Sequence, residues 1–178
     1  MFSPFIGLFL FHKIHFFVSI LVSIAIIVTG IMHVKRYRKE RLVVGCISSI
    51  YLSCMLYYML LGRPFQNERS VELHLFWSYK IAYETHNTML LLGNIANILV
   101  FFILTLLLCY LFLKPLACVC AVSLLSVFIE IIQLIFKLGV FEFDDIFHNV
   151  VGVGLAYIAF NRFFCLENSD VDINEKLI

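Results

Sequence analysis

Charged residues are scarce in this chain of 178 residues, since 14% are Asp, Glu, Lys or Arg while 62% are hydrophobic. A soluble domain carries about 25% charged residues, so this composition excludes a soluble domain. The 13 basic and 12 acidic side chains leave a formal net charge of +1. Proteins that bind nucleic acids concentrate basic residues to neutralise phosphates, so no nucleic-acid partner is expected. The composition indicates an integral membrane protein.

Several motifs that carry chemistry in other proteins are missing. The six cysteines include no C-x-x-C pair and lie within or beside apolar runs, so they do not indicate a disulfide framework. No small-residue A-x-A pattern follows the first apolar run, so we expect that run to remain as a helix and not to be cleaved as a signal. The sequence also lacks H-E-x-x-H, the pattern of many zinc enzymes. We therefore expect neither a cofactor nor a bound metal.

Long apolar runs are what the chain has in place of these motifs. A helix needs about 20 residues to cross the hydrocarbon of a bilayer. Five runs are close to this length or longer, and they cover residues 14–34, 42–61, 88–113, 116–136 and 147–165. Residues 2–11 either extend the first run or lie in the membrane interface. The sequence predicts an all-α, polytopic membrane helix bundle that forms one domain, residues 1–165, followed by a polar cytoplasmic tail of little order, residues 166–178.

The position of the basic residues predicts how the chain is oriented across the membrane. Residues 35–41 read KRYRKER and hold five Lys or Arg residues, and such loops face the cytoplasm. The N-terminus and the loop 63–86 are then outside, and the C-terminus is inside. Within that loop, residues 71–77 alternate in polarity and include Trp77, and Tyr79 follows, which is typical of a segment at the level of the lipid headgroups.

Polar side chains inside the spans are the candidates for a functional site. A carboxylate within a span costs about 2.5–3.5 kcal/mol on insertion scales, so Glu130 is expected to face the bundle interior and to have a partner. At about 100° per residue, one polar stripe follows the fourth span. It contains Ser123, Ser126, Glu130, Gln133 and Lys137. Two further polar faces are Asn94 with Asn97 on the third span, and Asp145, Asn149 and Gly152 on the fifth.

These faces are predicted to meet in one outward-facing pocket. With a rise of about 1.5 Å per residue, the polar groups of all three helices lie in the outer half of the membrane. The adjoining loop ends carry Arg63, Arg69, Asp144, Asp145 and His148. We expect ligand binding by Arg63, Arg69, Asn94, Asn97, Glu130, Gln133, Asp145 and Asn149. The candidates for a catalytic group are Glu130, Asp144 and Asp145.

Each candidate also has a simpler interpretation. The amides of the third and fourth spans would hold helices together through hydrogen bonds. Glu130 would pair with a nearby Lys or Arg. Asp144 and Asp145 would form a solvated turn near the start of a helix, where the helix dipole favours a carboxylate. Gly152 and Gly154 would let two helices approach closely.

Three blocks of the sequence resemble the VanZ-like membrane protein family. They read Asn94-x-x-Asn97-Ile-Leu-Val-Phe, Ser126-x-x-x-Glu130-x-x-Gln133-Leu and Val140-Phe-Glu-Phe-Asp144-Asp145-x-x-x-Asn149-x-x-Gly152. Arg63 and Arg69 fit the same pattern, and the resemblance covers about residues 45–160. Two positions depart from it: Ile103-Leu104-Thr105 replaces a common Pro-Leu-Gly step, and Gly139 replaces a common basic residue. The first change favours a straighter third helix, and the second removes a candidate contact to an anion.

The resemblance implies a small polytopic protein of a bacterial cytoplasmic membrane. The family takes its name from a component of glycopeptide-resistance clusters that is associated with teicoplanin more than with vancomycin. The resemblance carries no established mechanism with it. Membrane lipids are expected partners of any such protein.

Three functions stay open at this point. The first is binding of an amphiphile, a lipid-linked cell-wall intermediate or a lipoglycopeptide, with Arg63 and Arg69 holding an anionic head group. The second is an intramembrane enzyme in which Glu130 or the Asp144/Asp145 pair acts as general base. The third is a non-catalytic accessory subunit. A zinc-dependent enzyme that uses the loop histidines is a weaker version of the second.

Overall fold

The computed structural model describes the backbone of residues 39–175 and the side chains of residues 40–60 and 62–163. The first predicted span, residues 14–34, lies outside this range, as do residues 35–38 of the basic loop. The helices are α2 (Lys39–Leu56), α3 (Trp77–Thr85), α4 (Thr88–Phe112), α5 (Pro115–Phe136) and α6 (Phe143–Glu175), and a π-helical turn, η1 (Tyr57–Leu61), continues α2. Two short strands are β1 (Ser70–Glu72) and β2 (Val140–Glu142).

Four helices of the described range are long and apolar enough to cross a membrane. They comprise Glu40–Leu60, Thr88–Phe112, Pro115–Phe136 and Phe143–Phe163. The chain is therefore an all-α, multi-pass membrane protein, as predicted, and these helices match the second to fifth predicted spans. The orientation, with the N-terminus outside and the C-terminus inside, stays a prediction.

The loops and the C-terminal region differ from the sequence prediction. The loop 63–86 contains β1 and the helix α3, neither of which was predicted. Helix α6 continues ten residues past the predicted end at residue 165, so the tail expected to have little order is helical as far as Glu175. The sequence after residue 165 contains neither Gly nor Pro, the two residues that most strongly end a helix.

The chain divides into two compact units. Of the described residues, the first unit contains 39–74 together with 127–143, and the second contains 75–126 together with 144–175. Helices α2 and η1, both strands and the C-terminal part of α5 belong to the first unit. Helices α3, α4 and α6 and the N-terminal part of α5 belong to the second.

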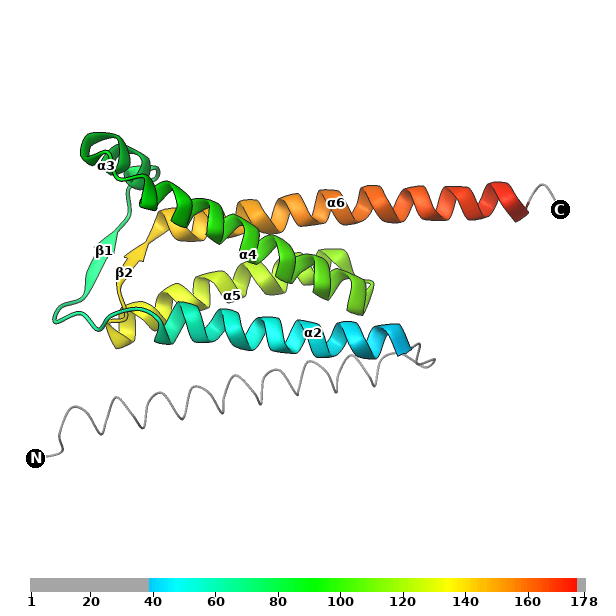
Figure 1. The fold of residues 1–178 in the computed structure, drawn as a ribbon, viewed down its shortest axis with the longest axis horizontal. Helices are drawn as coiled ribbons and strands as arrows, with labels where there is room; N and C mark the ends of the chain where they lie inside the picture. Colours follow the sequence, from blue (N-terminus) through cyan, green and yellow to red (C-terminus); the bar gives the residue numbers. More distant parts are fainter. Residues whose placement is uncertain (1–38, 176–178) are drawn as a thin grey trace, which may run out of the picture. The chain divides into compact units, whose positions relative to one another are not determined.

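In the first unit, the two strands pair in parallel. Val71 lies opposite Phe141 in the register, and the ribbons of β1 and β2 run side by side in Figure 1. The pairing joins the loop after η1 to the segment after α5. The backbone N–H of Gln66 supports it by donating to the carbonyl oxygen of Lys137 at 2.8 Å.

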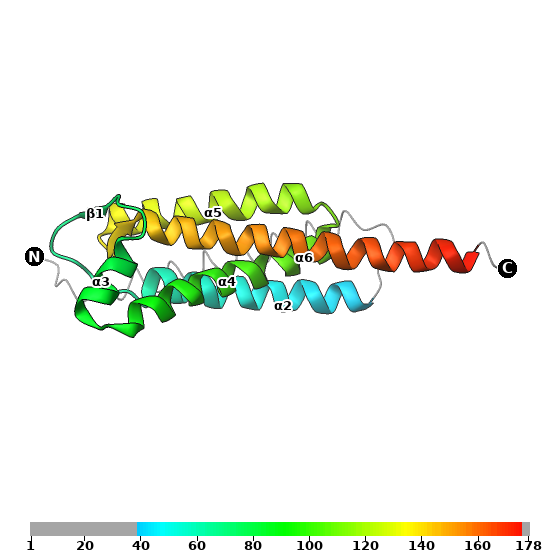
Figure 2. The same cartoon turned by 90° about the horizontal axis from the view of Figure 1, so that it is seen from above.

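In the second unit, α3 turns directly into α4. His86 ends α3 in the left-handed region at φ 52°, and the Asn87 side chain then caps α4 by accepting a hydrogen bond from the backbone N–H of Met89 at 3.0 Å. Figure 2 shows α3 at the N-terminal end of α4. A short connection of this kind keeps the side chains of α3 next to the first turn of α4.

Helices α4 and α6 touch at Gly152. A Cβ atom at this position would lie 2.2 Å from the carbonyl oxygen of Ile98, so only glycine fits there. The predicted close approach is thus confirmed for Gly152. For Gly154 it is wrong, because a Cβ atom there would meet no described atom within 4 Å.

Candidate functional site

Asp144 anchors the start of α3 in the second unit. Its Oδ1 accepts a hydrogen bond from the backbone N–H of Phe76, and its Oδ2 accepts bonds from the backbone N–H and the hydroxyl of Ser78, at 3.1 and 2.6 Å. The first N–H groups of a helix have no partner within the helix, and a carboxylate is the acceptor that suits them best. Asp144 thus caps a helix that lies more than sixty residues away in the sequence.

A hydrogen-bonded chain extends from this cap into α4. The side-chain N–H of Asn94 donates to the Ser78 hydroxyl oxygen at 3.0 Å, and that hydroxyl donates to Asp144. A serine hydroxyl can accept and donate at the same time, so it connects the two groups. Asn94, Ser78 and Asp144 are 6%, 2% and 0% exposed, so three helices are joined by polar groups shielded from solvent.

His148, one turn after Asp144, holds a second residue of α3. Its Nδ1 lies 2.6 Å from the carbonyl oxygen of Asp144, and its Nε2 lies 2.7 Å from the hydroxyl oxygen of Tyr79. A carbonyl oxygen can only accept, so Nδ1 carries a proton; in the neutral ring Nε2 then accepts from the tyrosine hydroxyl. The Phe76 and Phe147 rings pack edge-to-face beside this pair, with centroids 5.3 Å apart.

Two amides of the second unit connect its other helices. Asn97 on α4 donates to Oδ1 of Asp145 on α6 at 2.8 Å, and Asn149 on α6 donates to the hydroxyl of Ser126 on α5 at 2.8 Å. The simpler interpretation, that the amides of the third span hold helices together, is confirmed for Asn97, and the Asn149 bond adds a contact of the same kind that was not predicted. The interpretation of the acidic pair as a solvated turn is wrong, because Asp144 and Asp145 are 0% and 6% exposed in the first turn of α6.

Two polar residues near the C-terminal end of α5, and Lys137 just after it, bind backbone groups in the first unit. Gln133 donates to the carbonyl oxygen of Met59 in the π-helical turn at 2.8 Å, and an oxygen of Glu130 accepts from the backbone N–H of Glu142 at 3.2 Å. The ammonium group of Lys137 donates to the carbonyl oxygen of Asn67 at 2.7 Å. These three residues therefore hold the chain segments that surround the end of α5.

The two arginines of the expected site differ in their surroundings. Arg63 is half-buried, and its Cδ would lie 3.2 Å from a Cβ atom on Gly139. Gly139 has φ +125°, a conformation that favours glycine, so backbone shape and space both account for the missing basic side chain at this position. Arg69 is exposed just before β1.

The expected ligand-binding residues thus fall into two groups. Arg63, Arg69, Glu130 and Gln133 belong to the first unit, and Asn94, Asn97, Asp145 and Asn149 belong to the second. Asn97 and Asp145 meet directly, whereas Asn94 and Asn149 meet serine hydroxyls. The single outward-facing pocket that would join both groups stays a prediction.

Two buried side-chain oxygens within the described residues accept no hydrogen bond. They are Oε1 of Gln133 and Oδ1 of Asn149, on side chains that are 1% and 2% exposed. The indole Nε1–H of Trp77 is likewise buried and donates to no described residue. A buried polar atom without a hydrogen-bond partner lowers the stability of the fold by about 1–3 kcal/mol. A bound polar molecule that formed a hydrogen bond to one of these atoms would recover that free energy.

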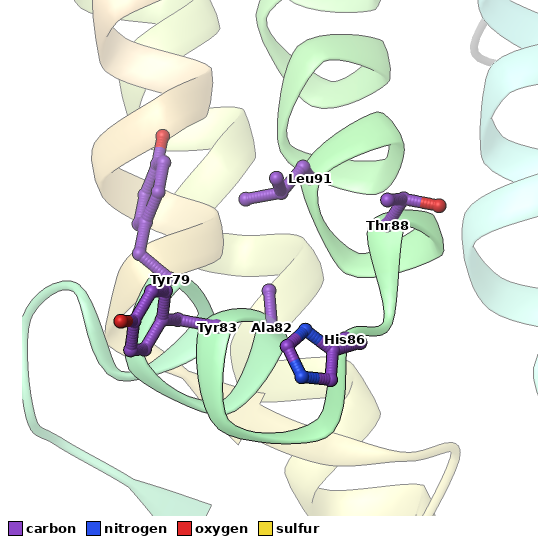
Figure 3. Close-up of a pocket in the computed structure, with 6 residues that line it drawn as sticks. All are labelled: Tyr79, Ala82, Tyr83, His86, Thr88 and Leu91. Carbon is purple, nitrogen blue, oxygen red and sulfur yellow. The ribbon is translucent and has the colours of Figure 1, made fainter.

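An open pocket of about 400 Å³ lies in the second unit where α3 meets α4 (Figure 3). It is lined by Tyr79, Ala82, Tyr83, His86, Thr88 and Leu91. The first three come from α3, His86 is the residue that follows this helix, and the last two come from the first turn of α4. Tyr79 belongs both to this lining and to the hydrogen bond with His148, so the pocket borders the buried polar network.

The sequence did not single out Ser78, Tyr79 or Tyr83 as site residues. They lie on α3, a helix that was not predicted because the residues before Trp77 alternate in polarity. The carboxylate that caps this helix is sixty-six residues away from Ser78, so no local sequence pattern marks the cap. A zinc-dependent enzyme would need the loop histidines and neighbouring residues to lie together as metal ligands. Among the side chains that the structure describes, no three His, Cys, Asp or Glu residues are placed to hold a metal ion.

Comparison with known proteins identifies the chain at the level of its family. No curated protein and no solved structure gave a match. A sequence model of the VanZ/LLP1 family matches residues 48–164, well over half of the chain. That range includes the pocket, the Asp144 cap and the polar stripe of α5. The chain therefore belongs to the VanZ/LLP1 family.

Proposed function

We propose that this chain is a bacterial cell-envelope protein that binds a lipid-tailed envelope molecule and so contributes to resistance to teicoplanin. Such a molecule is an amphiphile or a lipid-linked cell-wall intermediate. Membership of the VanZ/LLP1 family and the four apolar helices support this role in the cytoplasmic membrane.

The observation that carries the proposal is the pocket between α3 and α4. Sites for small ligands have volumes of about 300–1,000 Å³, and this pocket, at about 400 Å³, lies within that range. It opens at the N-terminal end of the span α4, where an amphiphile would have its polar head next to the pocket and its tail in the bilayer. The Asp144 cap and the Tyr79–His148 bond hold its α3 wall.

The contacts of the acidic pair favour binding over catalysis. Both oxygens of Asp144 already accept hydrogen bonds, and Asp145 accepts one from Asn97. A general base must lie within hydrogen-bond reach of the proton that it removes, and a carboxylate that holds the first N–H groups of a helix is less available for this. A carboxylate that holds a helix in place serves a binding site equally well, because binding needs no group that titrates.

Growth inhibition of a susceptible bacterium tests this function. We expect the wild-type chain to raise the inhibitory concentration of teicoplanin several-fold over an empty vector, and that of vancomycin less. Tyr79→Ala, which removes a wall of the pocket and the bond to His148, is expected to lose the protection. Tyr110→Ala is the matched control, since Tyr110 is a tyrosine of α4 that is 42% exposed and outside the pocket.

All strains must carry the same amount of the chain in their membranes, so that misfolding is not mistaken for loss of function. Equal teicoplanin sensitivity of the wild type and the empty vector would refute the resistance role in that host. Full protection by Tyr79→Ala at equal abundance would refute the assignment of the role to this pocket.

A further inference from the structure

The lining of the pocket at the α3–α4 corner limits the chemistry of its ligand. None of its six side chains carries a permanent charge. The charged residues of α3, Lys80 and Glu84, pair with each other at 3.9 Å and are not part of the lining. A ligand with a charged head group would lose the hydration of that charge in this pocket without meeting an opposite charge, and this costs free energy. The pocket therefore favours a ligand with an uncharged head group.

Aromatic rings and uncommitted polar groups occur together in this pocket. Tyr79 and Tyr83 supply ring faces, and Ala82 lies between Tyr83 and His86 (Figure 3). The side chains of Tyr83, His86 and Thr88 make no hydrogen bond to any residue that the structure describes. Sugars match this combination, because their C–H faces pack on the electron-rich faces of aromatic rings while their hydroxyls donate and accept hydrogen bonds at the edges.

An apolar track leads away from the pocket along α4. Leu91 lines the pocket, and Ile95 and Leu99 follow at four-residue intervals on the same face of the helix, each 52% exposed. Together they cover about two turns, or roughly 12 Å of the span. An alkyl chain attached to a head group in the pocket can lie along these side chains.

Resting on the proposed function, we propose that the pocket takes the uncharged glycosyl head of an amphiphile whose alkyl tail lies along Leu91, Ile95 and Leu99. The sugar ring stacks on the Tyr83 ring, and its hydroxyl groups form hydrogen bonds with the polar groups of Tyr83, His86 or Thr88. Two sources share this chemistry: a glycolipid of the envelope, and a sugar-bearing glycopeptide with a fatty acyl tail.

Photolabelling of the full-length chain in lipid nanodiscs tests the inference. The probe is octyl glucoside with a photoreactive diazirine on its sugar, and the labelled peptides are mapped by mass spectrometry. We expect labelling within residues 75–91 that excess octyl glucoside suppresses and excess octyl phosphate does not. Tyr83→Ala is expected to reduce it about five- to ten-fold, and Tyr83→Phe, which keeps the ring, much less.

Tyr83 is 82% exposed, so its replacement leaves the packing of α3 intact, and Tyr110→Ala again serves as the control. Teicoplanin and a diacyl glycolipid, used as competitors, distinguish the two sources. Equal suppression by octyl phosphate, or undiminished labelling in Tyr83→Ala, would overturn the inference. If the probe labels the site specifically but the chain gives the bacterium no resistance to teicoplanin, the proposed function alone is overturned. If the chain gives resistance but the probe does not label the site specifically, this inference alone is overturned.

Discussion

Replacing Asp144 with alanine is expected to lower the stability of the second unit by roughly 3–5 kcal/mol. The change leaves two backbone N–H groups and the Ser78 hydroxyl without their acceptor, and each such buried group costs about 1–3 kcal/mol. Because these groups start α3, the helix that carries Tyr79 and Tyr83 should loosen first. Thermal unfolding of the purified chain measures the loss, and limited proteolysis within residues 75–87 measures the loosening.

Two further variants show whether the cap causes the effect. Glu84→Ala removes an exposed carboxylate of α3 whose partner is the exposed Lys80, and such surface pairs contribute about 0–1 kcal/mol. Asp144→Asn keeps an acceptor oxygen, so it should lie between the wild type and the alanine variant. Equal unfolding temperatures for Asp144→Ala and Glu84→Ala would show that Asp144 does not hold α3.

Gly152→Ala is the second change with a large expected effect. Its Cβ atom would lie 2.2 Å from the carbonyl oxygen of Ile98, and backbone atoms cannot rotate away as a flexible side chain can. The helices α4 and α6 must therefore move apart, and overpacking of this kind costs about 1–3 kcal/mol. The separation would also stretch the Asn97–Asp145 hydrogen bond, which joins the same two helices.

Gly154 provides a control on the same helix, two residues further on. A Cβ atom there meets no described atom within 4 Å, and alanine is the better helix former by about 1 kcal/mol. Gly154→Ala should thus leave thermal unfolding unchanged or raise its midpoint slightly. If the two alanine variants unfolded at the same temperature, the close contact at Gly152 would be absent from the protein.

The four described membrane spans were predictable because length and apolarity alone define them. Helix α4 begins at Thr88 and ends at Phe112, within one residue of the predicted run, and it continues without a break through Ile103-Leu104-Thr105. The start of α6 at Phe143 was missed by four residues, because the acidic pair in its first turn resembles a loop. The buried amides of the spans were also recognisable, since a polar side chain within a long apolar run is costly unless it faces the bundle interior.

The partners of these polar groups were not predictable, because they are set by tertiary contacts. Asp144 meets residues of α3 that are sixty-six and sixty-eight positions earlier in the chain. Gln133 and Lys137 meet backbone carbonyl groups, which every residue has and no sequence pattern marks. The same limit applies to the pocket, whose α3 wall depends on a helix that the alternating residues before it did not suggest.

The most direct test of a binding role is to identify which membrane molecules stay bound to the chain when it is purified. Native mass spectrometry of the wild type, Tyr79→Ala and Tyr110→Ala, each solubilised from a bacterial membrane, would weigh the bound amphiphiles. We predict a bound lipid-tailed envelope molecule on the wild type and on Tyr110→Ala, and at least a several-fold loss of it from Tyr79→Ala. The same bound molecules at the same occupancy on all three proteins would contradict a binding site between α3 and α4.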